Sequence, residues 1–375
     1  MIHPIPSGTR DVLPEETREV RAITDTLRAV FERHGYGEVY TPALEYESVL
    51  QRADMADARP AYRVFDESGA VLVLRSDMTV PIARVVATRY ASSDPPLRFC
   101  YFAHCYRGVR PQRGQPRELL QAGIELVGSP APHGTAEALT VLCHALDATG
   151  LKSYRVGLGD ASLFPALMAS LRVPEHARAQ LLHALALRDF VGLELSLSEA
   201  GIAGEAAALL LEVPQRRGGP EVLADAPAQA QEAVTGLRRV HELLDPAVAA
   251  RVIFDLGLVR HIGYYTGAVF DVYDPALGAP IGGGGRYDEL LARFGPSLPA
   301  VGFALGVDRL HMALAGEERG TGALLARARA QEPERVAEPA LVADSALEAD
   351  PAREADPALV ADSAREADPA REAEL

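Results

Sequence analysis

The return of strand-like sequence after a long helical stretch constrains the fold most. Short apolar and aromatic runs precede residue 130, at 38–41, 71–75 and 97–106, and such runs return from Val252 in VIFDLGL and YYTGAVFDVY. The Ala-rich and Leu-rich segments between them, within residues 130–250, favour helices. Strands on both sides of a helical segment are typical of one sheet interrupted by an insertion. The sequence therefore predicts an α+β fold, an antiparallel sheet flanked by helices with a mainly helical insertion.

An amphipathic helix is predicted near the start of the chain. Residues 13–34 carry apolar side chains on one face, Pro14 lies near the start, and Gly35 follows the end. With the strand pattern, this gives four segments. They are a first part of the core (1–129), the mainly helical insertion (130–250), a second part of the core (251–316) and a tail (317–375).

The tail contains an acidic repeat. Residues 338–355 read EPALVADSALEADPAREA, and residues 356–373 repeat this 18-residue unit with two changes. Residues 338–375 hold eleven acidic and three basic residues, a net charge of −8, which is about half of the −15 of the whole chain. Such a segment cannot bury enough apolar surface to order itself, so we expect a disordered tail. A partner-binding tail is the alternative.

Composition limits the location and the partners. No apolar run approaches the ~18 residues that a membrane span needs, and the N-terminus lacks a signal-peptide core, so we expect a cytoplasmic protein. The acidic charge argues against binding to nucleic acid or to a membrane. Cys100, Cys105 and Cys143 lack metal-ligand spacing and fit small core residues. We expect neither a metal nor a cofactor, and we interpret His104 and His261 as pocket or core residues.

The clearest motif is a hairpin at residues 106–128, which read YRGVRPQRGQPRELLQAGIELVG. Its loop places four arginines within eleven residues: Arg107, Arg110, Arg113 and Arg117. In the returning strand, Leu120, Ala122, Ile124 and Leu126 point one way, toward a core. Gln121 and Glu125 point the other way, on either side of a glycine, and suit an ammonium or imidazole ligand. On pattern alone, a solvated sheet face fits at least as well.

Two shorter motifs carry polar groups that could bind a ligand. Asp77 and Thr79 follow a strand in LRSDMT; they could hold an amine or cap the next helix, and capping is the simpler interpretation. Arg260 precedes the pair Tyr264 and Tyr265, and an arginine so placed can hold a carboxylate or phosphate. The two tyrosines fit a polar lining or an ordinary core equally well.

A glycine run near the end of the core is the fourth motif. Residues 282–285 are all glycine, which lets a backbone approach a ligand closely, and Arg309 follows in GFALGVDRL. The run is not a phosphate loop, because GxxxxGK[ST] is absent and Lys152 is the only lysine. It indicates, weakly, a pocket of nucleotide or amino-acid size.

In this order, the motifs resemble the catalytic core of histidyl-tRNA synthetases, which are class II aminoacyl-tRNA synthetases. The resemblance covers roughly residues 5–314 and implies their antiparallel-sheet fold. By this resemblance, the residues that match the histidine pocket are Asp77, Thr79, Arg107, Gln121, Glu125, Arg260, Tyr264 and Tyr265. Arg107 also matches the arginine that meets the ATP α-phosphate, and Arg309 the third-motif arginine, so these two would mark a vestigial nucleotide site.

Several departures point away from a working synthetase. Val109 stands where the family's glutamate helps to recognise adenine, and Gly263 where an aspartate is usual. Asp77 and Asp308 replace glutamates. After the third motif, about sixty residues follow, whereas a synthetase continues into an anticodon-binding domain of about one hundred residues.

With these departures, the chain resembles the regulatory subunits of ATP phosphoribosyltransferase. The resemblance implies a subunit with no catalytic residues of its own. A short catalytic subunit would need it in order to be active in the first step of histidine biosynthesis. The resemblance also implies feedback inhibition by L-histidine and a homodimer within a hetero-octamer. The alternative is a histidine-activating enzyme that adenylates histidine with ATP and lacks an anticodon domain.

Overall fold

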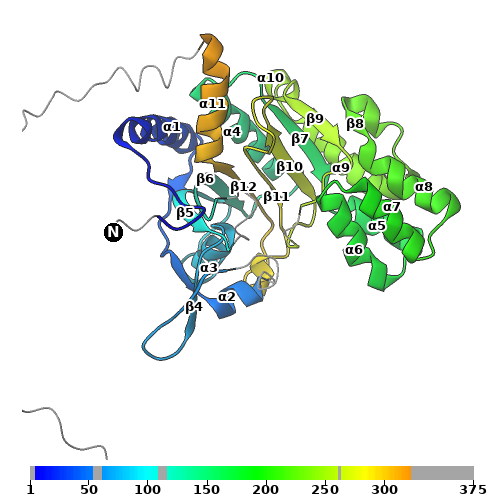
Figure 1. The fold of residues 1–375 in the computed structure, drawn as a ribbon, viewed down its shortest axis with the longest axis horizontal. Helices are drawn as coiled ribbons and strands as arrows, with labels where there is room; N and C mark the ends of the chain where they lie inside the picture. Colours follow the sequence, from blue (N-terminus) through cyan, green and yellow to red (C-terminus); the bar gives the residue numbers. More distant parts are fainter. Residues whose placement is uncertain (1–4, 54–60, 109–115, 261–262, 322–375) are drawn as a thin grey trace, which may run out of the picture. The chain divides into compact units, whose positions relative to one another are not determined.

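The computed structural model describes residues 5–53, 61–108, 116–260 and 263–321, without the side chains of residues 318–321 (Figure 1). All of these residues belong to one compact unit that ends at Gln331. The acidic repeat and most of the predicted tail lie outside the described residues. The predicted boundaries at 129, 250 and 316 remain predictions.

A nine-stranded sheet forms the centre of the described part of the chain. In spatial order its strands are β1 (Gly37–Glu38), β5 (Leu97–Tyr106), β6 (Glu118–Val127), β12 (Ala300–Gly306), β11 (Gly282–Arg286), β10 (Ala268–Tyr273), β7 (Arg155–Asp160), β9 (Val252–Asp255) and β8 (Arg217–Gly218). The sheet joins strands from both ends of the described chain, which confirms the predicted α+β architecture. It is antiparallel except where β1 pairs with β5 and β7 with β9, two parallel pairs that the sequence analysis did not predict.

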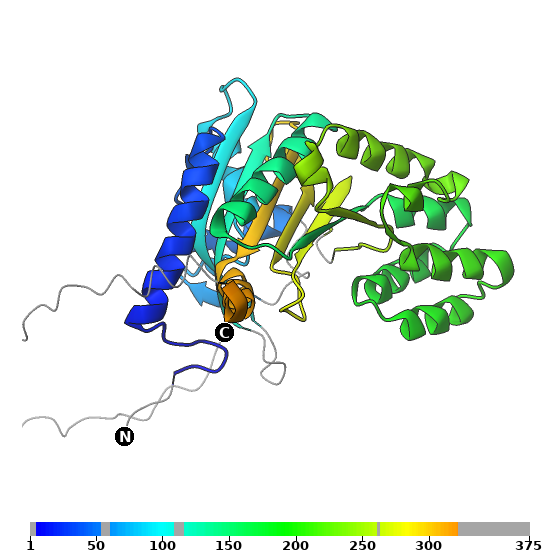
Figure 2. The ribbon, with the colours of Figure 1, turned by 90° about the horizontal axis from the view of Figure 1, so that it is seen from above.

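Four helices pack against one face of this sheet (Figures 1 and 2). They are α1 (Pro14–Arg33), α4 (His133–Thr149), α9 (Gln231–Glu242) and α11 (Val307–Thr321). The helix predicted at 13–34 is thus confirmed as α1. None of the described helices is long and apolar enough to cross a membrane.

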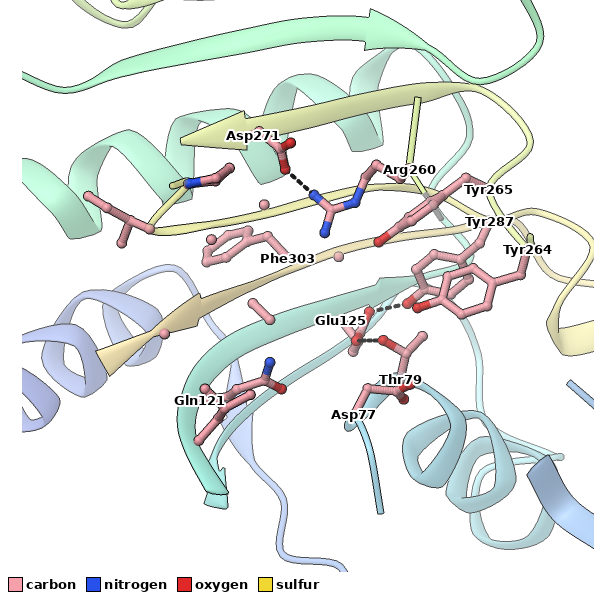
Figure 3. A pocket seen from close by; sticks show the side chains of 18 of the residues that line it. Asp77, Thr79, Gln121, Glu125, Arg260, Tyr264, Tyr265, Asp271, Tyr287 and Phe303 are labelled. Carbon is pink, nitrogen blue, oxygen red and sulfur yellow. Dashed lines mark hydrogen bonds and ion pairs between the residues drawn. The ribbon is translucent and has the colours of Figure 1, made fainter. Parts of the chain in front are cut away.

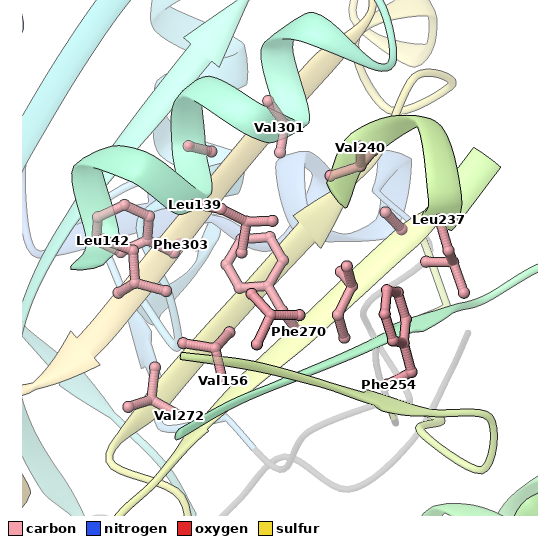
Figure 4. Close-up of a cluster of buried hydrophobic side chains, with 14 of the residues drawn as sticks. Leu139, Leu142, Val156, Leu237, Val240, Phe254, Phe270, Val272, Val301 and Phe303 are labelled. Atoms are coloured by element: carbon pink, nitrogen blue, oxygen red, sulfur yellow. The ribbon is translucent and has the colours of Figure 1, made fainter. Parts of the chain in front are cut away.

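The hydrophobic core fills the space between these helices and the sheet (Figure 4). Phe270 of β10 is fully buried there, beside Leu139 and Leu142 of α4. Ala122 and Ile124 of β6 reach the same core. Because side chains alternate along a strand, Gln121 and Glu125 must face the opposite side of the sheet. The alternation predicted for this strand is therefore confirmed, and it directs the polar side chains away from the helices.

A smaller sheet and two helices lie at the edge of the molecule. The sheet has the order β2 (Leu44–Tyr46), β4 (Val71–Leu74) and β3 (Arg63–Phe65). Helix α2 (Glu47–Arg52) follows β2, and α3 (Thr79–Arg89) follows β4. The second core cluster joins α3 to β5 through Val86 and Phe99. Helix α3 therefore begins close to the polar face of the large sheet.

The segment 130–250 also contributes strands to the large sheet. Its helices include α5 (Leu163–Ser170), α6 (Glu175–Ala186), α7 (Phe190–Glu199), α8 (Gly204–Glu212) and α10 (Pro246–Ala249). Short 3-10 helices occur in the same segment at Val213–Gln215, Pro220–Leu223 and Ala228–Ala230. Another 3-10 helix, Leu291–Arg293, lies outside this segment, between β11 and β12. Strand β7 pairs with β10 through six residue pairs, and β8 pairs with β9. The sequence analysis did not single out these strands, because RVGLGD is short and glycine-containing.

Candidate functional site

A cavity of about 290 Å³ opens on the face of the sheet opposite the four packed helices (Figure 3). This volume lies near the lower end of the ~300–1,000 Å³ range of small-molecule pockets. All nine residues predicted from the sequence line it: Asp77, Thr79, Arg107, Gln121, Glu125, Arg260, Tyr264, Tyr265 and Arg309. They come from α3, β5–β6, the segment before β10, and α11, so the fold gathers residues more than two hundred positions apart.

Glu125 of β6 is the most deeply buried carboxyl group of the cavity. Only 2% of its surface is exposed. Thr79 at the start of α3 donates a hydrogen bond to its Oε1 at 2.7 Å, and the Tyr287 hydroxyl donates to its Oε2 (Figure 3). Both carboxylate oxygens are thereby fixed in direction. Burial raises the pKa of Glu125 to about 8, although both hydrogen bonds oppose this rise, and nearby Asp77 adds to it.

This raised pKa predicts a pH-dependent loss of stability. The contribution of Glu125 to folding is fully present below its ordinary pKa of 4.5 and is lost as the pH rises through about 8. Glu125→Gln removes the ionisation. When the pH rises from 5 to 9, the free energy of unfolding of the variant should therefore increase relative to that of the wild type by on the order of a few kcal/mol. Denaturant unfolding of both proteins at the two pH values measures this gain. A stability difference that stays constant with pH would contradict it.

Asp77 takes the predicted role of a helix cap, and both Asp77 and Thr79 line the cavity. Asp77 Oδ1 accepts a hydrogen bond from the Val80 backbone N–H at 3.2 Å, so it caps the first turn of α3. Both Asp77 and Thr79 also line the cavity, and Asp77 is 8% exposed. The helix start thus brings a carboxylate and a hydroxyl beside Glu125.

Three tyrosines pack against one another, tilted or edge to face, along one wall of the cavity (Figure 3). The ring centroids of Tyr264 and Tyr265 lie 4.9 Å apart, and those of Tyr264 and Tyr287 lie 5.5 Å apart. Burial is the main cause that raises the pKa of Tyr264 and of Tyr287 well above the ordinary value, so both hydroxyls stay protonated. The Tyr264–Tyr265 pair is therefore both a polar lining and part of the second core cluster.

A fourth tyrosine fills the space beside Gly123. A Cβ built on Gly123 would lie 2.5 Å from the Tyr101 hydroxyl and 2.2 Å from the Phe303 carbonyl oxygen. The sequence pattern predicts a ligand between Gln121 and Glu125, which would use the space at this glycine. The structure gives it to Tyr101, whose own side chain then lines the cavity.

Arg260 lies on a different wall and is already paired within the chain. Its Nη1 forms an ion pair with Asp271 Oδ1 and donates to the Phe270 carbonyl oxygen at 3.1 Å (Figure 3). Burial is the main cause that raises the pKa of Asp271, and the charge of Arg260 opposes this rise. Asp271 thus holds the guanidinium in place at the cavity.

The glycine run is strand β11 at the centre of the sheet, not a loop. A Cβ on Gly283 would lie 2.2 Å from both Arg260 Nη1 and Asp271 Oδ1, and one on Gly285 would lie 2.8 Å from the Tyr265 ring. On the next strand, a Cβ on Gly302 would lie 1.9 Å from Glu125 Oε2. These glycines leave room for the polar side chains that line the cavity, which explains why a weak strand sequence occupies this position.

The remaining cations surround the cavity less directly. Arg309 donates to the Pro280 carbonyl oxygen at 2.6 Å, and Arg107 and Gln121 complete the lining. Asp308, where the family has glutamate, forms an ion pair with Arg10 at 2.9 Å. Val109, Arg110 and Arg113 lie outside the described residues. The predicted loss of adenine recognition at Val109 therefore stays a prediction.

Other sequence predictions about reactive groups can be compared with the structure. The three cysteines are buried in the two core clusters and form no disulfide, which confirms them as core residues. His104 is exposed, so its assignment to a pocket or core is wrong, and His261 lies outside the described residues. In the described ranges, no three His, Cys, Asp or Glu side chains are arranged to hold a metal ion.

Three important cavity residues were missing from the sequence predictions: Tyr101, Asp271 and Tyr287. The two tyrosines have partners far away in sequence: Tyr287 binds Glu125 across 162 positions, and Tyr101 binds the Phe303 carbonyl oxygen across 202. Asp271 had one available signal, because it lies on an otherwise apolar strand close after Arg260. A charge within AVFDVY needs a partner when the strand is buried.

The arrangement suits a small zwitterion with a polar ring. Glu125 and Asp77, with the Thr79 and Tyr287 hydroxyls, offer acceptors and donors to an amine or imidazole. Arg260 on the other wall offers a planar donor to a carboxylate. The tyrosine rings supply apolar surface between the two charged walls.

Comparisons with a family model and with curated proteins point to related families. The family model of histidyl-tRNA synthetases matches residues 8–310. An ATP phosphoribosyltransferase regulatory subunit of Symbiobacterium thermophilum is 41% identical, covering 82% of this chain and 79% of the relative, and one of Moorella thermoacetica is 40% identical, covering 82% and 81%.

A solved structure agrees with these relatives. The ATP phosphoribosyltransferase regulatory subunit/histidyl-tRNA synthetase of Bacillus halodurans has a TM-score of 0.76 and 32% identity, covering 84% of this chain and 83% of that protein. The fold is therefore that of the histidyl-tRNA synthetases, and the most similar curated relatives share one name. The chain belongs to the family of ATP phosphoribosyltransferase regulatory subunits, whose core is like that of histidyl-tRNA synthetases.

Proposed function

We propose that this chain is a non-catalytic subunit that binds L-histidine in the cavity and controls a separate short-form ATP phosphoribosyltransferase. In this role it is required for the first step of histidine biosynthesis and mediates feedback inhibition by histidine. The proposal includes a homodimer within a hetero-octamer, a cytoplasmic location, and no cofactor, metal or nucleic acid. The names of the relatives support the regulatory role.

The observation that carries the ligand assignment is the buried carboxyl of Glu125 between two hydroxyl donors. Thr79 and Tyr287 fix both of its oxygens, so the group faces the cavity in one orientation. With a pKa of about 8, the group holds a proton near neutral pH in the empty site. A neutral imidazole accepts that proton in a hydrogen bond, and an imidazolium ion displaces it. Either form of histidine therefore finds a matched partner.

The second half of the ligand matches Arg260. An amino-acid carboxylate can form paired hydrogen bonds with a guanidinium, and Arg260 reaches the cavity with its orientation fixed by Asp271. Asp77 supplies a further carboxylate for the amino group. The charges of the site thus complement both ends of histidine.

A second candidate function is activation of histidine with ATP. It is favoured by one observation: Arg107, Arg260 and Arg309, which match the synthetase cations, all line the same cavity. Against it, the Pro280 carbonyl oxygen engages Arg309. This contact reduces the donors that Arg309 can offer to phosphate oxygens.

Isothermal titration with L-histidine, together with an ATP/pyrophosphate exchange assay, tests the proposal. We expect saturable binding of one histidine per chain and no histidine-dependent exchange. Rapid exchange would instead support the activating enzyme. Failure of histidine to bind would overturn the ligand assignment, and L-lysine serves as a control ligand with a cationic side chain but no ring.

A further inference from the structure

One wall of the cavity belongs to the helical segment rather than to the sheet. Ala186, the last residue of α6, lines the cavity beside Val259 and Arg260. Helices α6 and α7 pack on each other, and residues 187–189 join them. We call residues 186–189 the α6–α7 corner. A ligand in the cavity therefore lies against this corner.

Arg188 attaches the α6–α7 corner to the sheet. Its guanidinium forms an ion pair with Asp255, the last residue of β9, which is completely buried. Arg217 of β8 binds the same Asp255 oxygen at 2.6 Å. Arg188 has φ of 58°, a left-handed conformation that non-glycine residues rarely adopt. The corner is thus a strained turn whose side chain is held by a buried carboxylate.

Further contacts lead from Asp255 back to the cavity. The Arg217 guanidinium lies 5.8 Å from the centre of the Tyr273 ring. Tyr273 and Asp271 are two residues apart on β10 and share one face of the sheet. A hydrogen bond with Tyr273 opposes the rise that burial causes in the pKa of Asp271. Since Asp271 pairs with Arg260, charged and aromatic groups connect the ligand-facing guanidinium with Arg188.

We infer that the α6–α7 corner senses an occupied cavity, and that the Arg188–Asp255 ion pair couples ligand binding to the stability of helices α6 and α7. This inference rests on the proposed function, because it takes histidine as the ligand. The ligand affects the corner in two ways: it lies against Ala186, and its carboxylate competes with Asp271 for Arg260. A ligand shifts a conformational equilibrium only through such differential contacts. Coupling of this kind is reciprocal, so a partner that orders the corner would also strengthen histidine binding.

Hydrogen exchange of the full-length protein, with and without L-histidine, tests the inference. The reporters are two backbone amides: that of Arg188 donates to the Leu185 carbonyl oxygen at 3.0 Å, and that of Asp189 donates to the Ala184 carbonyl oxygen at 2.9 Å. In the wild type, histidine should slow their exchange by about tenfold or more. In Arg188→Ala, exchange without ligand should be faster, and histidine at saturating concentration should no longer slow it. Arg188→Lys keeps the charge and should restore part of the response.

Arg172→Ala is the matched control. Arg172 also has a left-handed backbone, with φ of 56°, and lies in the same helical segment at the turn between α5 and α6. It should respond to histidine as the wild type does. If Arg188→Ala keeps the wild-type response, or if histidine binds without changing exchange at the corner, the inference is wrong while the proposed function stands. If titration shows no histidine binding at all, the proposed function fails, and the inference fails with it.

Discussion

Glu125→Gln should weaken histidine binding by at least about 30-fold. The substitution keeps the size of the side chain but removes the negative charge with which the carboxylate pairs with a bound imidazolium. Loss of one partner of a buried, hydrogen-bonded charge pair costs about 2–5 kcal/mol, and about 2 kcal/mol corresponds to 30-fold. Because Glu125 is 2% exposed, solvent cannot replace the lost interaction. Isothermal titration at pH 7 measures the change, and Glu125→Ala should abolish binding.

Glu118→Gln is the control for this prediction. Glu118 is the first residue of the same strand, β6, and is not among the residues that line the cavity. Its substitution should leave the histidine affinity within about twofold of the wild type, since surface changes away from a site have small effects. Unchanged affinity in Glu125→Gln, with a normal unfolding transition, would show that the ligand does not contact this carboxyl.

Gly302→Ala should have a comparably large effect without changing any polar group. The new Cβ would lie 1.9 Å from Glu125 Oε2 and 2.5 Å from the Ile124 carbonyl oxygen. The carboxyl must move, and its bonds with Thr79 and Tyr287 break with it. We expect at least a tenfold loss of histidine affinity and a loss of about 1–3 kcal/mol in the free energy of unfolding, as for other overpacked sites.

Two comparisons separate this effect from general damage to the sheet. Gly278→Ala places a Cβ where no heavy atom lies within 4 Å, so both affinity and stability should stay near wild type. In a Glu125→Ala background, where the carboxyl is absent, Gly302→Ala should cost less stability than in the wild type. Equal costs in both backgrounds would place the clash on the Ile124 backbone and not on Glu125.

The fold could be predicted where local pattern and tertiary structure agree. The helix at 13–34 is confirmed as α1 at 14–33, and the strand at 97–106 has the same bounds as β5. Both have a clear period and a clear stop. The glycine run at 282–285 could not be predicted as a strand, because glycine disfavours strands. Only the neighbouring side chains, such as Arg260 and Asp271 against Gly283, reveal why β11 must consist of glycine.

The cavity lining was predicted by combining local signals with the resemblance to histidyl-tRNA synthetases, since the local signals alone left simpler interpretations open. Gln121 and Glu125 are polar at alternate positions of a strand whose other face is apolar, and Arg260 precedes a tyrosine pair. The partners of these residues were not predictable in the same way. Tyr287 meets Glu125 because β12 pairs with both β11 and β6, in a register that sets Gly302 opposite Gly285 and Glu125. Asp271 lies opposite Gly283, and the room at this glycine lets it pair with Arg260. Sequence pattern indicates which side chains face a site, whereas register decides which of them meet.

Reconstitution with a short-form ATP phosphoribosyltransferase catalytic subunit tests the central claim most directly. The measurement is the phosphoribosyltransferase rate over a range of L-histidine concentrations, for complexes with the wild-type chain and with Glu125→Gln, each relative to its own rate without histidine. We predict that the wild-type chain activates the catalytic subunit and makes it sensitive to histidine, and that the Glu125→Gln complex needs at least about 30-fold more histidine for half inhibition. Equal histidine sensitivity of the two complexes, or no activation by the wild-type chain, would contradict the account.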